Sequence, residues 1–253
     1  MIFMSKRVYL AIVFFIGFLS IVIGQDTNYV YVDQNWQKTK PNKAKYIFRQ
    51  TKQTKGFLEE LSTSKGTKIY SIECSSLNPY IENGNSLCFD ERGELIEKGF
   101  FSNGCPDGIW IHFNPISKSV DSINYSDVNK IIELSKKQQC EDPFVIVEEM
   151  PTFPNNNDFN SKEIKLDFHS YLSSKKYYPE IAKKRGIKGS VYVLFVVDPE
   201  GNICDINFPK SPNSKILEYE TLRLMQDLPK WNPGKQNSKT KAVRIMESIN
   251  FYP

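Results

Sequence analysis

The most constraining feature of this chain is a hairpin pattern in its last third. Residues 190–197 are rich in β-branched and aromatic side chains and are apolar at both odd and even positions. This pattern is typical of a strand that is covered on both faces or paired on both sides. The turn-forming residues 198–202 follow, and residues 203–208 then alternate between apolar and polar. The pattern predicts two antiparallel strands inside a small sheet.

Two helices are predicted before this hairpin. Residues 160–172 carry apolar side chains at intervals of four and begin with Asn160 and Ser161, which can cap a helix. A second, shorter helix is predicted over residues 180–185, with Pro179 near its first position and Gly186 at its end. Both helices precede the hairpin in the chain.

A third helix and a last strand follow the hairpin. Leucines and a methionine describe an amphipathic helix over residues 217–228, which Pro229 ends. Residues 242–251 then alternate, and one face of this strand holds Val243, Ile245, Ile249 and Phe251, with Glu247 as the exception. The order of these elements predicts an α+β fold, a small antiparallel sheet with helices on one face.

The N-terminus predicts export. Lys6 and Arg7 precede the apolar residues 8–23, and Gly24 provides a small residue before a cleavage site at Gln25. We interpret residues 1–24 as a secretory signal peptide, which would place the mature protein in the periplasm or cell envelope. The alternative is an uncleaved anchor in the inner membrane, because the apolar stretch approaches the length that spans a bilayer.

Residues 25–125 are predicted to form a mostly β domain of hairpin repeats. Strand patterns at residues 68–73, 86–90 and 109–113 are separated by turn signals at residues 83–85, 91–94 and 103–104. Residues 84–113 repeat a theme of glycine, strand and aromatic, and this theme resembles MORN-type repeats. Six aromatic side chains can serve either as a ligand platform or as the core of the sheet, and we favour the core: Tyr70, Phe89, Phe100, Phe101, Trp110 and Phe113.

Residues 126–146 differ in pattern from the residues before them, and we interpret them as a short helix and a linker between two domains.

The balance of charge argues against a nucleic-acid surface, because removal of the signal peptide leaves a net charge of about +2. The lysines between Lys38 and Lys55 are therefore interpreted as a solvated face.

The five cysteines show no metal or redox spacing, so neither a metal site nor an oxidoreductase is predicted. Cys204 shares a face with apolar neighbours and is predicted to be a small buried thiol. A disulfide between Cys74 and Cys88 is a further hypothesis.

Catalytic patterns are also missing from the sequence. His112 and His169 stand apart, and the adjacent Glu148 and Glu149 point to opposite faces of an extended segment, so they cannot act as an acid and base pair. The sequence therefore predicts a protein that is not an enzyme and that uses no cofactor.

Residues 147–253 resemble the C-terminal domain of TonB-type energy transducers. The motifs that carry the resemblance are the leading segment 147–154, Tyr178-Pro179, residues 182–189, the turn at 198–202 and residues 229–235. The resemblance implies binding of an extended segment from an outer-membrane receptor or other envelope protein by β-augmentation, in association with transmembrane transport. The implied contact residues are Tyr178, Pro179, Val243, Arg244, Ile245, Met246, Ile249 and Phe251.

Three alternatives remain open. The leading segment of this domain could itself cover the edge of the last strand. The chain could act as a structural protein that binds the cell wall or surface through its repeat region, with peptidoglycan as the partner. It could also be a membrane-anchored transducer, although residues 25–142 differ from the long proline-rich spacer of such proteins.

Overall fold

The computed structural model describes residues 27–126, 142–154, 167–212 and 214–252. These residues form two compact units that divide between Ser122 and Ile123. The predicted signal peptide, the helix predicted after residue 126 and the predicted caps Asn160 and Ser161 lie outside the described residues. In the part of the chain that is described, no helix has the length and apolar character to cross a membrane.

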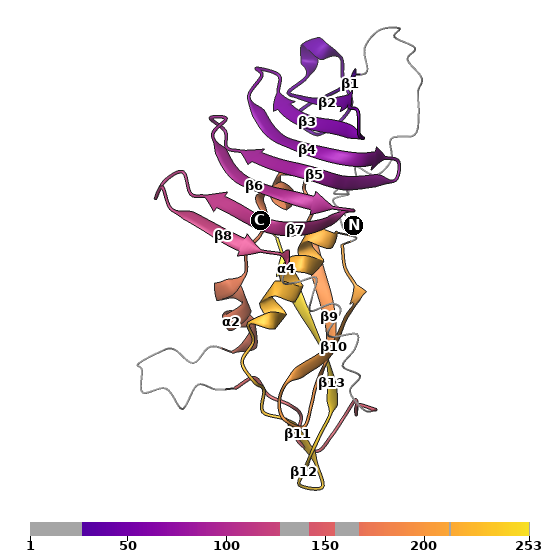
Figure 1. The fold of residues 1–253 in the computed structure, drawn as a ribbon, viewed down its shortest axis with the longest axis vertical. Coiled ribbons are helices and arrows are strands. Elements are labelled where there is room, and N and C mark those ends of the chain that lie inside the picture. The colour runs from indigo at the N-terminus through magenta and orange to yellow at the C-terminus, as the bar shows by residue number, and fades with distance from the viewer. Residues whose placement is uncertain (1–26, 127–141, 155–166, 213, 253) are drawn as a thin grey trace, which may run out of the picture. The chain divides into compact units, whose positions relative to one another are not determined.

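The first unit is an eight-stranded sheet in which the strands follow their order in the chain (Figure 1). The strands from β1 to β7 pair antiparallel, each with the next, as in a meander of hairpins. They are β1 (Thr27–Val32), β2 (Tyr46–Lys52), β3 (Phe57–Thr63), β4 (Lys68–Leu77), β5 (Tyr80–Phe89), β6 (Leu95–Ser102), β7 (Cys105–Phe113) and β8 (Val120–Asn124), with a short 3-10 helix, η1 (Pro41–Lys43), between β1 and β2.

Aromatic side chains form much of the core of the first unit. Tyr70, Phe101 and Trp110 are each no more than 2% exposed, which supports the interpretation of these three as core residues. Phe101 meets Trp110 edge to face with ring centroids 5.1 Å apart. Trp110 lies against Gly99, where any β-carbon would come within 2.1 Å of the indole ring. Phe100, in contrast, is 43% exposed.

The prediction of a turn at residues 83–85 is wrong, because strand β5 continues through these residues. Gly84 has a positive φ of 122° inside the strand, and the pairing of β4 with β5 shifts register nearby. A β-carbon on Gly84 would fall 2.2 Å from the Glu73 carboxylate, which accepts the Asn85 amide hydrogen. The glycine therefore makes an irregularity within a strand, where the sequence suggested a reversal.

The proposed disulfide between Cys74 and Cys88 is also wrong. Both cysteines are thiols in the structure. Cys88 lies opposite Tyr70 on β4, whereas Cys74 lies opposite Glu82 on β5. The two are therefore offset by about four residues, or about 13 Å along the strands, and this exceeds the roughly 7 Å limit between the Cα atoms of a disulfide.

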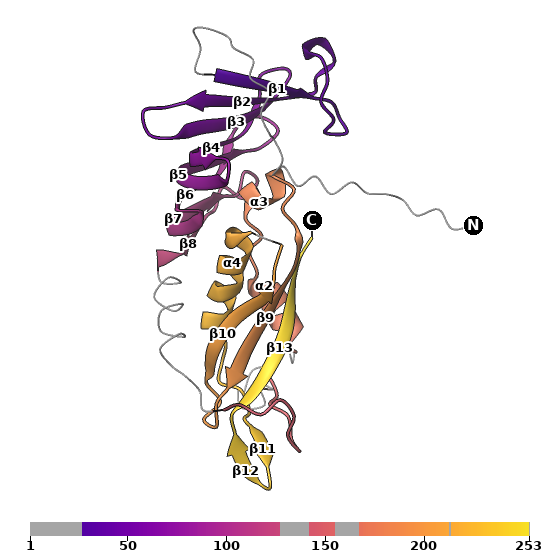
Figure 2. The same ribbon diagram turned by 90° about the vertical axis from the view of Figure 1, so that its right-hand side faces the viewer.

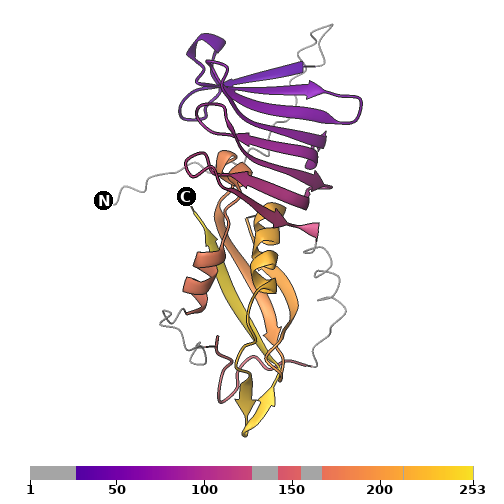
Figure 3. The same cartoon turned by 60° about the vertical axis from the view of Figure 1, so that its left-hand side comes forward.

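The second unit is a three-stranded antiparallel sheet with helices on one face (Figures 2 and 3). The strand order is β10, β9, β13, so β9 is central. This arrangement confirms the predicted fold class. The elements are α2 (Phe168–Lys175), α3 (Glu180–Lys184), β9 (Gly189–Val197), β10 (Ile203–Lys210), α4 (Lys215–Gln226) and β13 (Val243–Phe251), together with a hairpin of β11 (Gly234–Gln236) and β12 (Lys239–Lys241) that the sequence analysis missed.

Trp231 anchors the core of the second unit. Its ring lies edge-on to Phe153, Phe168 and Phe195 at centroid distances of 5.7, 5.3 and 5.5 Å, so it joins the leading segment, α2 and β9. Its amide donates to the carbonyl of Gly201 in the β9–β10 turn at 2.8 Å. These contacts fit the role that the sequence suggested for Trp231, a core anchor.

Cys204 differs from its prediction. It is buried, as expected, but it is disulfide-bonded and is therefore not a thiol. The pairing of cysteines depends on the fold and cannot be deduced from spacing.

Candidate functional site

The candidate site is the outer edge of β13. All nine residues of this strand pair with β9 in an unbroken antiparallel register, from Val243 opposite Val197 to Phe251 opposite Gly189. Because β13 is the last strand in the sheet order, its other side has no strand partner of comparable length among the described residues.

The leading segment covers only the beginning of this edge. Phe144 donates its amide to the carbonyl of Ala242 at 2.9 Å and accepts from the amide of Arg244 at 2.8 Å. The segment then leaves β13, and its later residues Glu149 and Thr152 pair with Lys235 and Asn232 instead. Within the described ranges, the self-covered alternative thus holds for residues 242–244 and for no further part of the edge.

These bonds also identify which backbone groups point outward. In an antiparallel strand the N–H and C=O of one residue point to the same side, and those of the next residue point to the opposite side. Since Arg244 points outward to Phe144, Met246, Ser248 and Asn250 do so as well. The carbonyl of Asn250 confirms this alternation, because it accepts a hydrogen bond from the Lys176 ammonium at 2.6 Å.

The open part of the edge has two defined ends. Phe144 occupies one end, and Lys176, whose Nζ also lies 5.5 Å from the centre of the Phe251 ring, occupies the other. The outward groups between them belong to Arg244, Met246, Ser248 and Asn250, and they span about 20 Å at the usual rise of a strand. An extended segment of a few residues can pair with such an edge.

The opposite edge of the sheet, β10, is irregular. Its pairing with β9 shifts register twice, Asp205 has a φ of +51°, and Pro209 lies near the end of the strand. Bulges and prolines are the devices by which edge strands avoid pairing with other chains. The two edges therefore differ, and only the edge at β13 is regular.

The strand divides the predicted contact residues between two faces. Val243, Ile249 and Phe251 are buried on the face that carries the helices, and Ile245 is partly buried there. Their side chains belong to the core. They support the edge without offering a side-chain contact to a partner.

The other face of β13 is more accessible. Met246 is 60% exposed on this face, and the Arg244 guanidinium pairs with Asp205 of β10 at 3.1 Å. Met246 is therefore the predicted contact residue whose side chain is most available to a partner.

Tyr178 and Pro179 lie beside the end of β13. The Tyr178 ring meets Phe251 edge-on at 5.7 Å, and its hydroxyl donates to the carbonyl of Ile187 at 2.6 Å. Burial raises the pKa of this hydroxyl. Pro179 is buried at the start of α3. Both residues shape the end of the site through packing.

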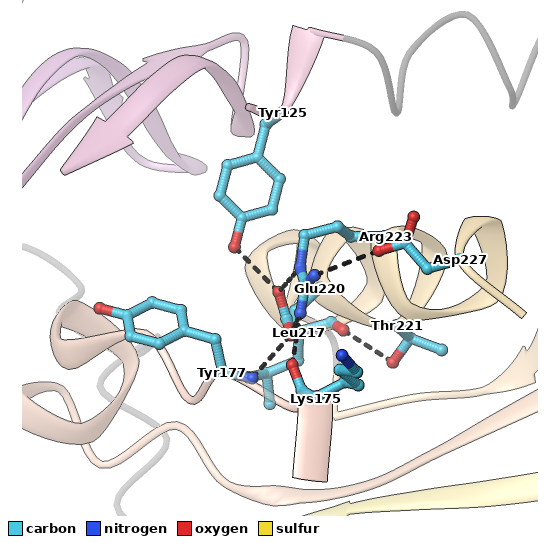
Figure 4. A network of polar contacts seen from close by, with 8 residues as sticks. All are labelled: Tyr125, Lys175, Tyr177, Leu217, Glu220, Thr221, Arg223 and Asp227. Atoms are coloured by element: carbon cyan, nitrogen blue, oxygen red, sulfur yellow. Dashed lines mark hydrogen bonds and ion pairs between the residues drawn. The ribbon is translucent and has the colours of Figure 1, made fainter. Parts of the chain in front are cut away.

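A buried ion pair fixes the chain that leads to Tyr178 (Figure 4). Glu220 on α4 has no exposed surface and accepts two hydrogen bonds from Arg223, at 2.7 and 2.8 Å, and one from the amide of Tyr177 at 2.8 Å. Arg223 also donates to the carbonyl of Lys175. Burial raises the pKa of the Glu220 carboxyl, while the Arg223 guanidinium opposes that shift. The pair thus ties the segment 175–177 to α4.

A second polar contact lies along the helix side of the edge. His169 on α2 approaches Glu247 of β13, with Nε2 and Oε2 3.5 Å apart. Burial raises the pKa of Glu247, and His169 opposes this shift. Sequence reasoning missed Phe144, Lys176 and His169 as residues at the edge. Only the fold brings these distant positions to β13.

Comparison with known proteins identifies relatives of the C-terminal region. Residues 174–253 match the family described as "Gram-negative bacterial TonB protein C-terminal". Two proteins named "Protein TonB", from two strains of Helicobacter pylori, are 35% identical over 89 and 66 residues, which is 35% and 26% of this chain. The matches cover 31% and 24% of those relatives, so this chain spans about a third of their length or less.

A solution structure of the TonB C-terminal domain of Helicobacter pylori is 27% identical over 33% of this chain and 77% of that chain, with a TM-score of 0.25. The family match confirms the resemblance seen in the sequence for residues 174–253. The MORN-type repeats expected in residues 25–125 stay a prediction.

Proposed function

We propose that the second unit binds proteins of the cell envelope by adding an extended segment of the partner to β13. The observation that carries this proposal is the run of outward backbone groups from Arg244 to Asn250 on a regular edge. A guest strand would pair with the outward groups that Phe144 and Lys176 do not already bond, and it would rest beside Met246, which is 60% exposed.

The resemblance to TonB supports an outer-membrane receptor as the partner and a role associated with transport across the envelope. The sequence-predicted contact residues fit this mode of binding in different ways. Arg244 and Met246 offer outward backbone groups, whereas Val243, Ile245, Ile249 and Phe251 hold the strand in place. Tyr178 and Pro179 border its end.

A proline at Ser248 tests the proposal. The N–H of Ser248 points away from β9, so proline removes a group that only a guest would use, and its ring would obstruct the guest. We expect full-length Ser248→Pro to keep its circular dichroism spectrum and to lose capture of receptors from an outer-membrane extract. Ser248→Ala keeps the N–H and should capture them as the unchanged protein does.

Amide exchange gives a second readout for the same test. Addition of a synthetic peptide from a captured receptor should slow exchange at Met246 and Ser248, and should leave the amides that already bond to β9 unchanged. Equal capture by Ser248→Pro and the unchanged protein, or no new protection at Met246 and Ser248, would refute β-augmentation at this edge.

A further inference from the structure

A corner of the first unit concentrates positive charge. The turn between β1 and β2 carries the exposed lysines Lys40, Lys43 and Lys45, and the neighbouring turn between β3 and β4 carries Lys65. The two turns are joined, since the amide of Ser64 donates to the carbonyl of Lys45 at 2.8 Å. We call these four residues the lysine corner.

The backbone of this corner is held in one shape. The amides of Thr39 and Lys45 donate to the carbonyls of Tyr31 and Val32, and η1 closes the turn between them. The Trp36 ring stacks flat on Tyr46, with centroids 4.6 Å apart and planes 4° apart, although Trp36 has a φ of +60°. Such a conformation is costly for a bulky residue, so the surrounding contacts must impose it.

Little negative charge lies within the two turns of the corner. The nearby acids Asp90, Glu91 and Glu94 belong to the β5–β6 turn, whose Gly93 lies beside Thr67. The β1–β2 turn contains one acid, Asp33, whose carboxylate accepts the amides of Asn35 and Gln37. Among the described residues, the ion pairs found do not include Lys40, Lys43, Lys45 or Lys65. Like charges held together in this way repel one another, and a bound anion would relieve that repulsion.

The corner also has a concave surface. An open depression of about 560 Å³ is lined by Lys38, Thr39, Lys40, Asn42 and Lys43. The depression is open to solvent, and its lining supplies ammonium, hydroxyl and amide groups that can donate to oxygen atoms. Figures 1 and 2 show the turn that carries η1 projecting beyond the ends of β1 and β2.

We infer that the lysine corner binds a phosphate-bearing glycan. A phosphomonoester carries nearly two negative charges at neutral pH and several acceptor oxygens, so it matches a cluster of ammonium groups better than a single carboxylate does. The hydroxyl and amide groups of Thr39 and Asn42 suit the sugar to which the phosphate is attached. This surface would hold the first unit on a polyanionic surface without using the edge at β13.

Titration calorimetry with deacylated lipopolysaccharide, a soluble phosphorylated oligosaccharide, tests the inference on the full-length protein. We expect binding that weakens as salt rises from about 50 to 200 mM, as for other polyanions. The triple variant Lys40→Gln, Lys43→Gln and Lys65→Gln should bind at least about tenfold more weakly, and the slope of log affinity against log salt should fall by about two or three. The matched control is Lys52→Gln with Lys55→Gln, at the other end of β2, which should bind as the unchanged protein does.

Further binding measurements identify the chemical class of the ligand. Removal of phosphate from the oligosaccharide should abolish binding, and Ser248→Pro should leave it unchanged, which separates this inference from the proposed function. Absence of binding to deacylated lipopolysaccharide, equal losses in the triple and control variants, or undiminished binding of the dephosphorylated sugar would overturn the inference. Tighter binding to phosphatidylglycerol vesicles or to single-stranded DNA would also overturn it, in favour of a membrane or a nucleic acid.

Discussion

At two glycines of this protein, a neighbouring group leaves no room for a side chain. Gly99 leaves room for the Trp110 ring, and Gly201 leaves room for the carbonyl of Trp231, which would lie 2.1 Å from a β-carbon on the glycine. Gly201 also needs its positive φ of 83° for the turn, whereas Gly99 lies in an extended strand that any residue could adopt. The requirement at Gly99 is therefore set by packing alone.

Replacement of Gly99 by alanine should destabilise the first unit by about 1–3 kcal/mol. In an unobstructed strand the same change would stabilise, because glycine loses more conformational freedom on folding. Urea unfolding measures the difference. In a Trp110→Leu background the obstruction is removed, so Gly99→Ala should become neutral or stabilising. A loss of equal size in both backgrounds would mean that the indole ring is not the cause.

Glu247 makes the stability of the second unit depend on pH. Burial raises its pKa above the ordinary value of 4.5, so the folded state binds a proton more tightly than the unfolded state does. Its contribution to the free energy of unfolding is therefore fully present below pH 4.5 and is lost as pH rises through the raised pKa. Relative to Glu247→Gln, the unchanged protein should lose stability across that interval.

The measurement is urea unfolding of both proteins at a series of pH values. His169→Gln removes the group that opposes the shift, so it should enlarge the pH-dependent loss. A difference between the unchanged protein and Glu247→Gln that stays constant with pH would contradict this account.

At the scale of elements, the second unit depends on how its helices are held beside the sheet. Glu220 and Arg223 on α4 bind the backbone of residues 175–177, which connect α2 to α3. The next residue, Tyr178, packs on Phe251 at the end of β13. The position of this end of the candidate site is thus determined by a contact that lies wholly inside the fold.

Glu220→Ala should cost about 3–5 kcal/mol of unfolding free energy, because it leaves the partly buried Arg223 with only the exposed Asp227 carboxylate, 3.7 Å away, as an ionic partner. Glu149→Ala is the control, since Glu149 pairs with Lys235 at an exposed position, where such pairs contribute less than about 1 kcal/mol. A double-mutant cycle with Arg223→Ala, followed by thermal or urea unfolding, isolates the coupling. If the two single losses simply add, the pair does not act as a unit.

Elements with a clear local signal were the ones that the sequence could predict. Helix α4 and strand β13 repeat their apolar pattern over enough residues to reveal their period, and the hairpin of β9 and β10 is marked by a long apolar run and a turn signal. Gly84 was misread because Asn-Gly-Asn is a turn signal locally, whereas the Glu73 carboxylate on the neighbouring strand decides its conformation. The strands β11 and β12 have three residues each, which is too short for any period to show.

In the candidate site, too, only the residues with a local sequence signal could be predicted. The edge residues of β13 could be named from the strand pattern and from the family resemblance. Phe144 and Lys176, which bound the edge, could not, because each reaches β13 from a distant part of the chain. Nor did the sequence show that β10 is irregular, because Asp205 at positive φ has no distinctive signal of its own.

The whole molecule combines two chemically different surfaces. The edge at β13 offers backbone groups to an extended polypeptide, and the lysine corner offers ammonium groups to an anion. Each belongs to a separate compact unit with its own buried core. The proposals for the two surfaces can therefore be tested independently in one full-length protein, by variants that differ in which unit they change.

The redox state of Cys204 indicates the compartment in which this protein folds. A disulfide at Cys204 is expected in a protein that leaves the reducing cytoplasm, as the predicted signal peptide indicates. Reductant should lower the unfolding free energy of the second unit by about 2–4 kcal/mol, because it removes a constraint on the unfolded chain. Cys204→Ser should show the same loss, and reductant should then have no further effect.

Alkylation of the native protein, read by mass spectrometry, should label the partly exposed thiol of Cys105 and spare Cys204. Rapid labelling of Cys204 in protein taken directly from cells would show that the bond does not form there, and it would count against export.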